Sequence, residues 1–335
     1  MSSLMRQEAL EAPEAVARFL TTNAPALAAL EQRLAAAPPT FAVTCARGSS
    51  DNAAAYFKYA LEIADGTPVA SLGASVVSVY GTRLKLSGAL CLTISQSGQS
   101  PDIVALQEEA RRAGALTVAL VNADNSPVGR SADICLSLCA GPEKSVAATK
   151  SFIASLAGAA AIVAAWRGDA ALKAALSDLP EQLRRACAGT WPEFVETLAA
   201  AHSLYVLGRG PAFPIAAEIA LKLKETCALH AEAYSAAEVM HGPLELVQTG
   251  FPAIVLAPED AAQPAMKAAA QRLAGLGAKA LLLGGGGFPL TPAGHALLQP
   301  LPLVQTAYLA IEALARRRGR NPDTPHNLKK VTETV

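Results

Sequence analysis

The sequence predicts an α/β protein made of two consecutive halves, each with a parallel sheet covered by helices on both faces. Short aliphatic runs alternate with longer helical segments along the chain, which is the pattern of parallel α/β sheets. The halves also look like copies, because landmarks recur at a nearly constant offset. Arg47-Gly48 follows the first expected strand of one half and Arg209-Gly210 that of the other, an offset of 162. Gly114-Ala115 and Gly277-Ala278 precede later strands at an offset of 163.

The expected elements follow in chain order. We expect a leading helical segment at 1–36, a first domain at 37–166, a helical linker at 167–200, a second domain at 201–319 and a tail at 320–335. Strands are expected at 40–45, 68–71, 89–94, 116–121 and 134–138, and then at 204–207, 253–256 and 280–283. Helices fill the intervals, including one at 214–230, and Pro180 and Pro192 are expected to break the linker.

Composition and missing motifs exclude several classes of protein. The 28 Lys and Arg residues balance 28 Asp and Glu residues, which argues against a nucleic-acid partner. The longest apolar stretch, 152–166, is too short to cross a bilayer and is expected to be a buried helix. The N-terminus lacks the apolar core of a secretory signal, and the six cysteines form no CxxC pair, so we expect a cytoplasmic protein with free thiols.

No metal or cofactor motif is present. HExxH spacing is missing, and His230-x-Glu232 lacks the PCxxC partner of zinc deaminases. There is neither a GxxxxGK[ST] loop nor a GxGxxG after a strand, which disfavours nucleotides. We therefore expect neither a metal nor a cofactor.

A hydroxyl-rich loop, residues 95–100, follows the expected strand at 89–94. Ser100 fits a helix N-cap with Pro101 at the first helical position. Hydroxyls, backbone N–H groups and the positive end of a helix together form a phosphate cradle. A second loop, residues 47–52, stands in the same place after the first strand, so both loops are expected at one sheet edge around a phosphorylated small molecule. The alternative interpretation is an ordinary polar loop with a good cap.

Candidate acid–base groups lie in the second half. Glu218, Lys222 and Glu225 are spaced i, i+4 and i+3, so they share one face of the helix expected at 214–230. The alternative interpretation is a solvated charged face. His241 lies in a Met-His-Gly-Pro context typical of a loop, where an imidazole can exchange protons at neutral pH.

These residues resemble the isomerase half of glucosamine-6-phosphate synthase, which consists of two sugar isomerase (SIS) domains. The resemblance extends from about residue 40 to the C-terminus and implies two tandem SIS domains, each with a flavodoxin-like parallel sheet. It is carried by Ser95-Gln96-Ser97-Gly98-x-Ser100-x-Asp102, Val146-Ala147-Ala148-Thr149-Lys150-Ser151-Phe152, Gly208-Arg209-Gly210, Ala220-Leu221-Lys222-Leu223-Lys224-Glu225, His230-Ala231-Glu232-Ala233 and His241-Gly242-Pro243.

One difference from the synthase indicates the direction of the reaction. Only about forty residues precede the first expected strand, so no glutaminase domain is expected. Without an ammonia source, the same chemistry would hydrolyse glucosamine 6-phosphate to fructose 6-phosphate and ammonia. Further motifs look like SIS-type glucosamine-6-phosphate deaminases: 47–51, 79–81, 143–150 and the tail 329–334. The alternatives are another SIS phosphosugar aldose–ketose isomerase, a sugar–amine deglycase and a non-catalytic sugar-phosphate sensor.

The resemblance also implies roles for individual residues. The phosphate and sugar hydroxyls would be bound by Ser50, Ser95, Gln96, Ser97 and Ser100, while Ala148 stands where the synthase has a sugar-contacting serine. Glu225 would move a proton between C1 and C2. His241 would open the sugar ring from the neighbouring subunit, which implies a homodimer with composite active sites. Lys222 and a tail lysine, Lys330 or Lys329, would stabilise oxyanion charge or contact the open-chain sugar.

Overall fold

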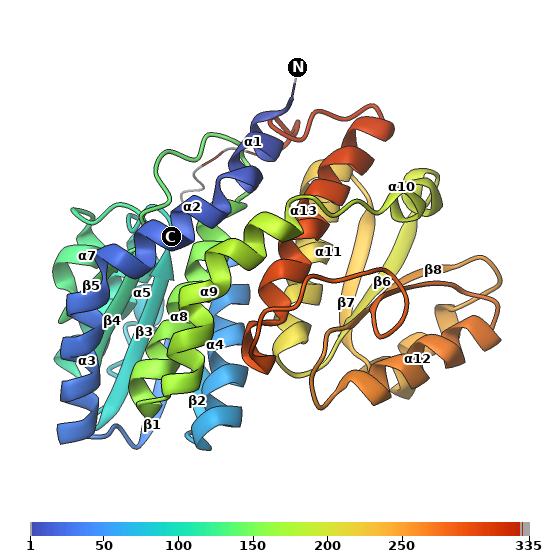
Figure 1. The fold of residues 1–335 in the computed structure, drawn as a ribbon. Helices are drawn as coiled ribbons and strands as arrows, with labels where there is room; N and C mark the ends of the chain where they lie inside the picture. The colour runs from blue at the N-terminus through green and yellow to red at the C-terminus, as the bar shows by residue number, and fades with distance from the viewer. Residues whose placement is uncertain (1, 329, 331–335) are drawn as a thin grey trace. The chain divides into compact units, whose positions relative to one another are not determined.

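The computed structural model, which describes residues 2–328 and 330, contains two parallel sheets flanked by helices (Figure 1). The α/β fold predicted from the sequence is confirmed. The first sheet consists of β1 (Phe41–Cys45), β2 (Val69–Ser71), β3 (Ala89–Ser95), β4 (Leu116–Val121) and β5 (Ile134–Ser137). The second consists of β6 (Ser203–Gly208), β7 (His230–Ser235), β8 (Pro252–Ala257) and β9 (Lys279–Gly284).

The two sheets have the same strand order. The first is β2-β1-β3-β4-β5 and the second is β7-β6-β8-β9, so the second repeats the first four strands of the first. All neighbouring strands are parallel, but the order in which they are added changes side: β2 lies on one side of β1, and β3 lies on the other. The same switch point occurs between β6 and β8. Ligands of open α/β sheets bind at such a switch point, at the carboxyl ends of the strands.

The chain divides into two compact units. The five-stranded unit comprises Glu14–Glu143 and Lys150–Ser177. Of the described residues, the four-stranded unit comprises 2–13, Lys144–Thr149, 178–328 and Lys330. These units are defined by contacts in space, and each contains segments that are far apart in the sequence. The domain boundaries expected from the sequence follow chain order and stay a prediction.

In the five-stranded unit, helices form a layer on each side of the sheet. One layer contains α3 (Ala24–Ala36), α4 (Ser49–Asp65) and α8 (Lys150–Arg167), and the other contains α5 (Ser75–Ser78), α6 (Pro101–Arg112) and α7 (Pro127–Ser131). Helix α8 is buried from Lys150 to Ala165, as the apolar stretch predicted. No helix in the described part of the chain is both long and apolar enough to cross a membrane. All six cysteines are free thiols, as expected.

In the four-stranded unit, α11 (Phe213–Cys227) packs against β6 and β7, and α13 (Pro300–Arg317) packs against α11. Helices α1 (Leu4–Leu10) and α10 (Pro192–Ala199) contact α13. Helix α12 (Gln263–Gly275) contributes Met266 and Leu273 to a core with Tyr205, Leu207 and Val255. Short 3-10 turns occur at Gly210–Ala212 (η1), Glu238–His241 (η2), Pro243–Leu246 (η3) and Ala296–Leu298 (η4).

The leading segment and the linker are helical, and the linker differs in detail from expectation. The expected leading helical segment contains three helices, α1, α2 (Ala12–Thr22) and α3. Pro180 lies inside α9 (Ala170–Ala186) and does not break it. Leu172, Leu176, Leu179 and Leu183 are buried at helical spacing along α9. Their packing offsets the hydrogen bond that a proline removes from a helix. Pro192 does act as a start, at the first position of α10.

The strand β7 was missed, and the helix expected to reach residue 230 is shorter. Helix α11 ends at Cys227, and Ala228 adopts a left-handed conformation with φ of +48° that turns the chain into β7. The sequence of β7, HAEAYS, contains no β-branched residue, and β7 lies at the edge of its sheet. An edge strand of this composition lacks the apolar pattern that identifies a buried strand.

Candidate functional site

The loop after β3 forms a tight turn at the amino end of α6. The Ser95 hydroxyl accepts a hydrogen bond from the Gly98 N–H at 3.0 Å, and Gly98 has a φ of +61°. As predicted, Ser100 is the N-cap of α6 and Pro101 is the first residue of the helix. The Ser100 hydroxyl makes no capping hydrogen bond. Ser97 and Ser100 are half-buried, so their hydroxyls line a turn that is still accessible to a ligand.

The loop after β1 lies beside it. Gly48, with a φ of +59°, is the N-cap of α4, and Ser50 lies in the first helical turn. Because β1 and β3 are neighbouring parallel strands, both loops flank the switch point of the five-stranded sheet. An ion pair between Arg47 and the completely buried Asp102 joins them directly. The structure therefore brings the predicted phosphate-binding residues to one edge of one sheet.

The equivalent edge of the four-stranded sheet carries different chemistry. Gly210 follows β6 with a φ of +56°, as Gly48 follows β1. After β8, however, the chain continues with Pro258, Glu259 and Asp260 rather than with serines. Burial raises the pKa of Asp260 from its usual value, against hydrogen bonds from two backbone N–H groups that lower it. Carboxyl groups repel a phosphate, so only the first half offers the hydroxyl cradle.

The acid–base candidates of α11 form a compact buried cluster. Lys222 Nζ lies 2.5 Å from Glu225 Oε2 and 3.3 Å from Glu218 Oε1. The side chains of Lys222 and Glu218 are 1% and 0% exposed, whereas that of Glu225 is 22% exposed. Burial alone would lower the pKa of Lys222, but the two carboxylates outweigh it and raise that pKa above its ordinary value. The solvated-face interpretation is therefore wrong for Glu218 and Lys222.

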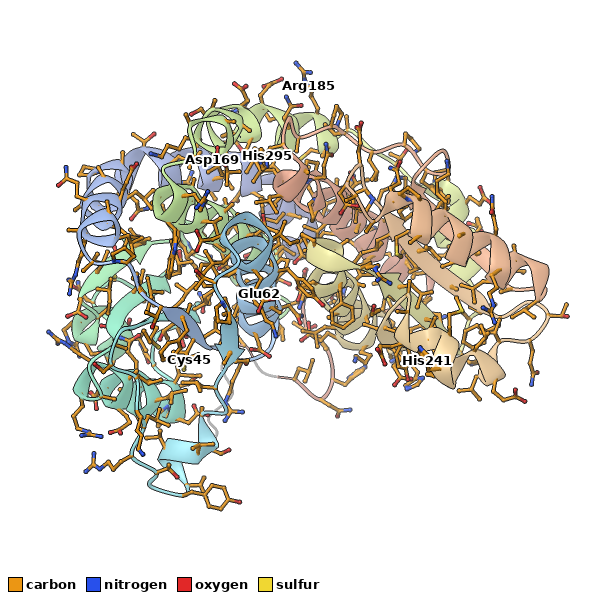
Figure 2. All side chains as sticks on the ribbon, turned by 90° about the horizontal axis from the view of Figure 1, so that it is seen from below. Cys45, Glu62, Asp169, Arg185, His241 and His295 are labelled. Atoms are coloured by element: carbon orange, nitrogen blue, oxygen red, sulfur yellow. The ribbon has the colours of Figure 1, made fainter. Side chains whose placement is uncertain are left out.

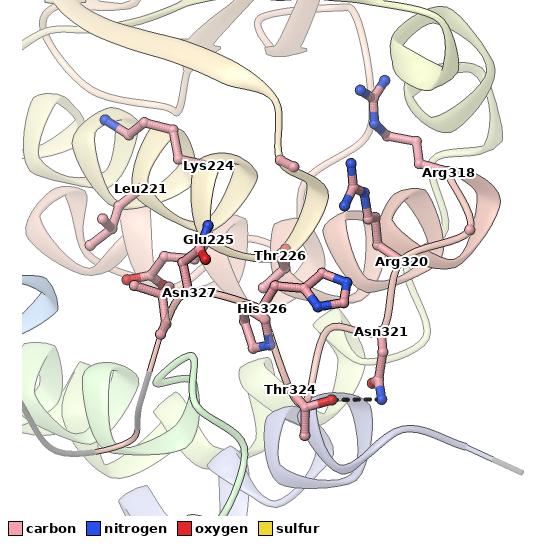
Figure 3. A pocket seen from close by; sticks show the side chains of 14 residues that line it. Leu221, Lys224, Glu225, Thr226, Arg318, Arg320, Asn321, Thr324, His326 and Asn327 are labelled. Atoms are coloured by element: carbon pink, nitrogen blue, oxygen red, sulfur yellow. Dashed lines mark hydrogen bonds between the residues drawn. The ribbon is translucent and has the colours of Figure 1, made fainter.

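Glu225 opens onto a pocket of about 1080 Å³ between the end of α11 and the tail (Figure 3). The side chains of Lys224, Arg320 and His326 give this pocket a basic lining. Arg318, also in the lining, anchors the end of α13. Its guanidinium donates to the carbonyl oxygens of Ala199, Ala201 and Cys227 at 2.8–3.1 Å, at or just beyond the ends of α10 and α11.

Lys330 is fixed to the segment that contains Ala148. Its Nζ donates to the Ser145 carbonyl oxygen at 2.7 Å, and Ala148 is half-buried three residues further on. The Glu8 carboxylate on α1 holds the same segment by accepting hydrogen bonds from the N–H groups of Lys144 and Ser145. Lys329 and the tail motif at 331–334 lie outside the described residues.

The tail is anchored to α1 and to the same segment by Asp323. Its carboxylate accepts hydrogen bonds from the N–H groups of Leu4 and Met5, both at 2.8 Å. The Asp323 carbonyl oxygen accepts from the Val146 N–H at 3.4 Å. Helix α1, the segment 144–149 and the tail are therefore one hydrogen-bonded assembly within the four-stranded unit.

His241 is exposed at the end of η2 (Figure 2) and is absent from the lining of the Glu225 pocket. The Tyr205 hydroxyl holds this loop by donating to the Pro243 carbonyl oxygen at 2.8 Å. Glu232, another carboxylate of the second half, lies on β7, where its hydrogen bond raises the pKa of Tyr234 to about 12. Within one chain, His241 therefore lies outside the pocket that Glu225 lines.

Several supporting residues were not predicted as a set. Asp102 was part of a recognised motif, but its pairing with Arg47 required the β1–β3 neighbourhood. Glu8 is more than a hundred positions away from Ser145, and no local pattern connects them. His326 stands in the tail without a motif of its own. Within residues 2–328 and 330, no group of three or more His, Cys, Asp or Glu side chains is arranged to hold a metal ion.

Comparison with known families decides the relationship. The model of the SIS domain matches residues 42–165 and 197–286, one stretch in each half of the chain. The chain belongs to the SIS domain family. The two matched stretches coincide with the two sheets of like strand order, which is the expected tandem arrangement of SIS domains.

The chain is similar to curated proteins and to solved structures over nearly its whole length. The glutamine–fructose-6-phosphate aminotransferase [isomerizing] of Zymomonas mobilis is 32% identical over 97% of this chain and 58% of its own length. The chain spans about half the length of the curated relatives it matches. A solved structure from Silicibacter pomeroyi, assigned as a phosphosugar isomerase, is 45% identical over 96% of this chain and 100% of its own, with a TM-score of 0.93. The C-terminal domain of glucosamine-fructose-6-phosphate aminotransferase from Francisella tularensis is 26% identical over 97% and 99%, with a TM-score of 0.82.

Proposed function

We propose that this SIS protein is a glucosamine-6-phosphate deaminase, which converts glucosamine 6-phosphate and water to fructose 6-phosphate and ammonia. The observation that carries the proposal is the Glu225 carboxylate, which opens onto a pocket while the buried Lys222 ammonium holds it at 2.5 Å. Moving a proton between adjacent sugar carbons needs a positioned carboxylate base with a cation beside the oxygen that gains charge.

The reaction divides into three steps. An acid–base group, for which His241 is the candidate, opens the sugar ring. Glu225 then takes the proton from C2 of the open-chain aldehyde, and Lys222 stabilises the negative charge that develops on O1. Return of the proton to C1, with transfer of one N–H proton to O1, leaves an imine at C2 and a hydroxyl group on C1. Water then adds to the imine to release ammonia and the C2 ketone. Lys330 is the candidate for a second cation near the open-chain sugar.

Binding of the phosphate is assigned to the other unit. The hydroxyls of Ser50, Ser95, Ser97 and Ser100 and the side chain of Gln96 stand at the switch point of the five-stranded sheet, where anions bind next to helix N-termini. Ala148 would leave more room and one hydroxyl fewer beside the sugar. A homodimer and a cytoplasmic location belong to the same proposal.

The direction toward ammonia release is supported by the sequence motifs that resemble SIS-type deaminases. A second candidate, a phosphosugar aldose–ketose isomerase without C–N cleavage, is favoured by the relative from Silicibacter pomeroyi at 45% identity. The deaminase and the isomerase reactions use the same proton transfer, so the presence of Glu225 and Lys222 does not distinguish them. The two reactions differ in whether the substrate has an amino group on C2 that is released as ammonia.

A substrate panel tests the proposal. The purified protein is incubated with the 6-phosphates of glucosamine, galactosamine, mannosamine, glucose and galactose, and both ammonia and the ketose product are measured. A deaminase releases ammonia and ketose in equal amounts from glucosamine 6-phosphate and leaves the neutral aldose phosphates unchanged. Ketose formation from a neutral aldose phosphate without ammonia release from any amino sugar would replace the deaminase by the isomerase.

A further inference from the structure

A tyrosine on α13 completes the buried cluster of α11. The Tyr308 side chain is fully buried, and its hydroxyl donates to Glu218 Oε1 at 2.9 Å. The same oxygen lies 3.3 Å from Lys222 Nζ, which in turn lies 2.5 Å from Glu225 Oε2. Hydrogen bonds and ion pairs therefore run from Tyr308 through Glu218 and Lys222 to Glu225, which reaches the pocket.

The charges in this cluster change when Glu225 acts as a base. A carboxylate that accepts a carbon-bound proton becomes neutral, so Lys222 loses the negative charge of one of its two neighbours. A fully buried ammonium without a counter-ion is strongly destabilised. Glu218, which does not reach the pocket, can keep its charge throughout and serve as the lasting counter-ion of Lys222.

Glu218 is itself 0% exposed, so its ionised form depends on hydrogen-bond donors. Tyr308 supplies one such donor from a second helix. We propose that Tyr308 is a positioning residue whose hydroxyl keeps Glu218 ionised, so that Lys222 stays charged and in place while Glu225 carries the substrate proton. The inference rests on the proposed function in taking Glu225 as the base, and it extends the site to a residue that does not touch the substrate.

The test replaces Tyr308 by Phe, which keeps the ring and removes only the hydroxyl. The matched control is Thr306→Val, because Thr306 is a buried hydroxyl on the same helix that donates to the Ala186 carbonyl oxygen at 3.0 Å, outside the cluster. Exchange of the C1-bound proton of fructose 6-phosphate in heavy water that contains ammonium measures the proton-transfer step without net turnover.

We expect Tyr308→Phe to lower kcat for exchange about 10- to 100-fold, the range for one hydrogen bond to a charged group, with KM within about twofold. Thr306→Val should retain the wild-type kcat. A merely structural role of Tyr308 would change thermal stability to a similar extent in both variants and leave kcat unchanged. That result would overturn the inference.

A double-mutant cycle tests whether Tyr308 acts through Glu218. If it does, adding Tyr308→Phe to Glu218→Gln costs no further activity, because the charge that needs the hydroxyl is already gone. Losses that multiply in the double variant would overturn the inference. If Tyr308→Phe alone fails to fold, Glu218→Gln should restore folding by removing the buried charge; a double variant that also fails to fold contradicts the proposed role.

The two proposals fail in different ways. A wild-type protein that neither exchanges the sugar proton nor releases ammonia contradicts the proposed function, and the inference falls with it. An active wild type with an equally active Tyr308→Phe variant overturns the inference alone. Exchange of the sugar proton without ammonia release would favour the isomerase over the deaminase as the proposed function. The double-mutant cycle on Tyr308 and Glu218 would still test the inference, because both reactions use the same proton transfer.

Discussion

Glu225 differs from the other charged residues of its cluster because it combines a buried partner with an accessible oxygen. Glu218 is completely buried and Lys222 is a cation, so neither is placed to take the sugar proton. Glu225 retains 22% of its side-chain exposure and lines the pocket. A base needs this combination, because its charge must be stabilised while a lone pair stays available to the substrate.

Replacement of Glu225 by Gln tests this role. Gln keeps the size and hydrogen-bonding capacity but cannot accept the proton, so kcat should fall at least about 100-fold while binding of fructose 6-phosphate stays nearly unchanged. Ammonia release, deuterium exchange and calorimetric affinity are the readouts. Glu232→Gln is the control, since Glu232 lies on β7 in a hydrogen bond with Tyr234, and its kcat should stay near the wild-type value. Undiminished exchange in Glu225→Gln contradicts the assignment.

Glu109 on α6 offers a prediction about acid stability. Its carboxylate accepts hydrogen bonds from Arg112, from the Leu84 N–H at 2.8 Å and from Arg83. These interactions, with Arg112 first, lower the pKa of Glu109 to about 2, against the opposing effect of burial. The folded-state pKa lies below the unfolded value of about 4.3, so the stabilisation is present above that pH and disappears as the pH falls toward 2.

Urea unfolding at pH 6, 4 and 3 checks this expectation. The unfolding midpoint of the wild type should fall more steeply with acid than that of Glu109→Gln, which lacks the titrating group. Glu108→Gln, at the exposed neighbouring position of the same helix, should behave like the wild type. Parallel curves for the wild type and Glu109→Gln would show that this carboxylate does not couple folding to pH.

At the scale of elements, the two βα loops of the five-stranded unit depend on glycines in unequal ways. Gly48 and Gly98 have nearly the same φ, +59° and +61°. A Cβ on Gly48 would meet nothing within 4 Å, whereas one on Gly98 would lie 2.1 Å from Ser126 Oγ and 2.6 Å from Ser126 Cβ. The loop at 95–100 therefore rests directly on the start of α7.

Alanine at each position separates strain from contact. Gly48→Ala should cost about 1–3 kcal/mol, because a φ of +59° with a ψ of −132° is a backbone conformation that side-chain-bearing residues rarely adopt. Gly98→Ala should cost a further 1–3 kcal/mol or so because Ser126 must move. It should also raise KM for the sugar phosphate by displacing Ser97 and Ser100. Thermal unfolding and steady-state kinetics provide the measurements, and equal effects of the two substitutions would contradict the close packing seen at Ser126.

The sequence predicted most elements because their patterns are strong and local. Expected and observed limits of the buried strands agree within one or two residues, as for β4 at 116–121. The failures have physical causes. Strand β7 is an exposed-edge element without β-branched residues, and Pro180 is held in α9 by four buried leucines. Tertiary packing outweighs local propensity at both places.

The candidate site was predictable only where its contacts are local in sequence. Lys222 and Glu225 are three residues apart on one helix, so their pairing followed from helical spacing. The contact of Tyr308 with Glu218 spans 90 positions, and that of Lys330 with Ser145 spans 185. The burial of Glu218 could not be predicted from the sequence either, because it results from the packing of α13 on α11.

At the scale of the whole molecule, the two halves share a fold but differ in the residues at the edges of their sheets. Both sheets share the strand order that creates a switch point, and both place a left-handed glycine after the first strand. Only the first half carries serines after its third strand, where the second half carries Glu259 and Asp260. The second half carries the buried Lys222 and the accessible Glu225 on its first long helix instead. A single half therefore lacks one of the two functions that the proposed reaction needs.

His241 leads to the prediction at the largest scale. It follows Glu225 by 16 positions but is exposed and absent from the lining of the Glu225 pocket. A second subunit can supply it if the protein is a symmetric dimer, because each interface contact then occurs twice. Glu225→Gln and His241→Ala subunits, each inactive alone, would combine so that one site of every hybrid dimer has both residues intact.

Two differently tagged variants, co-expressed and purified over both tags, give hybrid dimers free of the parent forms. One intact site of two predicts about half of the wild-type activity for purified hybrids, and about a quarter for an unsorted equal mixture. The matched control combines Glu225→Gln with His241→Ala in one subunit and pairs it with wild type. This pairing breaks both sites if His241 acts across the interface, and only one if it acts within its own chain. Activity in the control but not in the hybrids would place ring opening within one chain, which would then require the η2 loop to reach the pocket by movement.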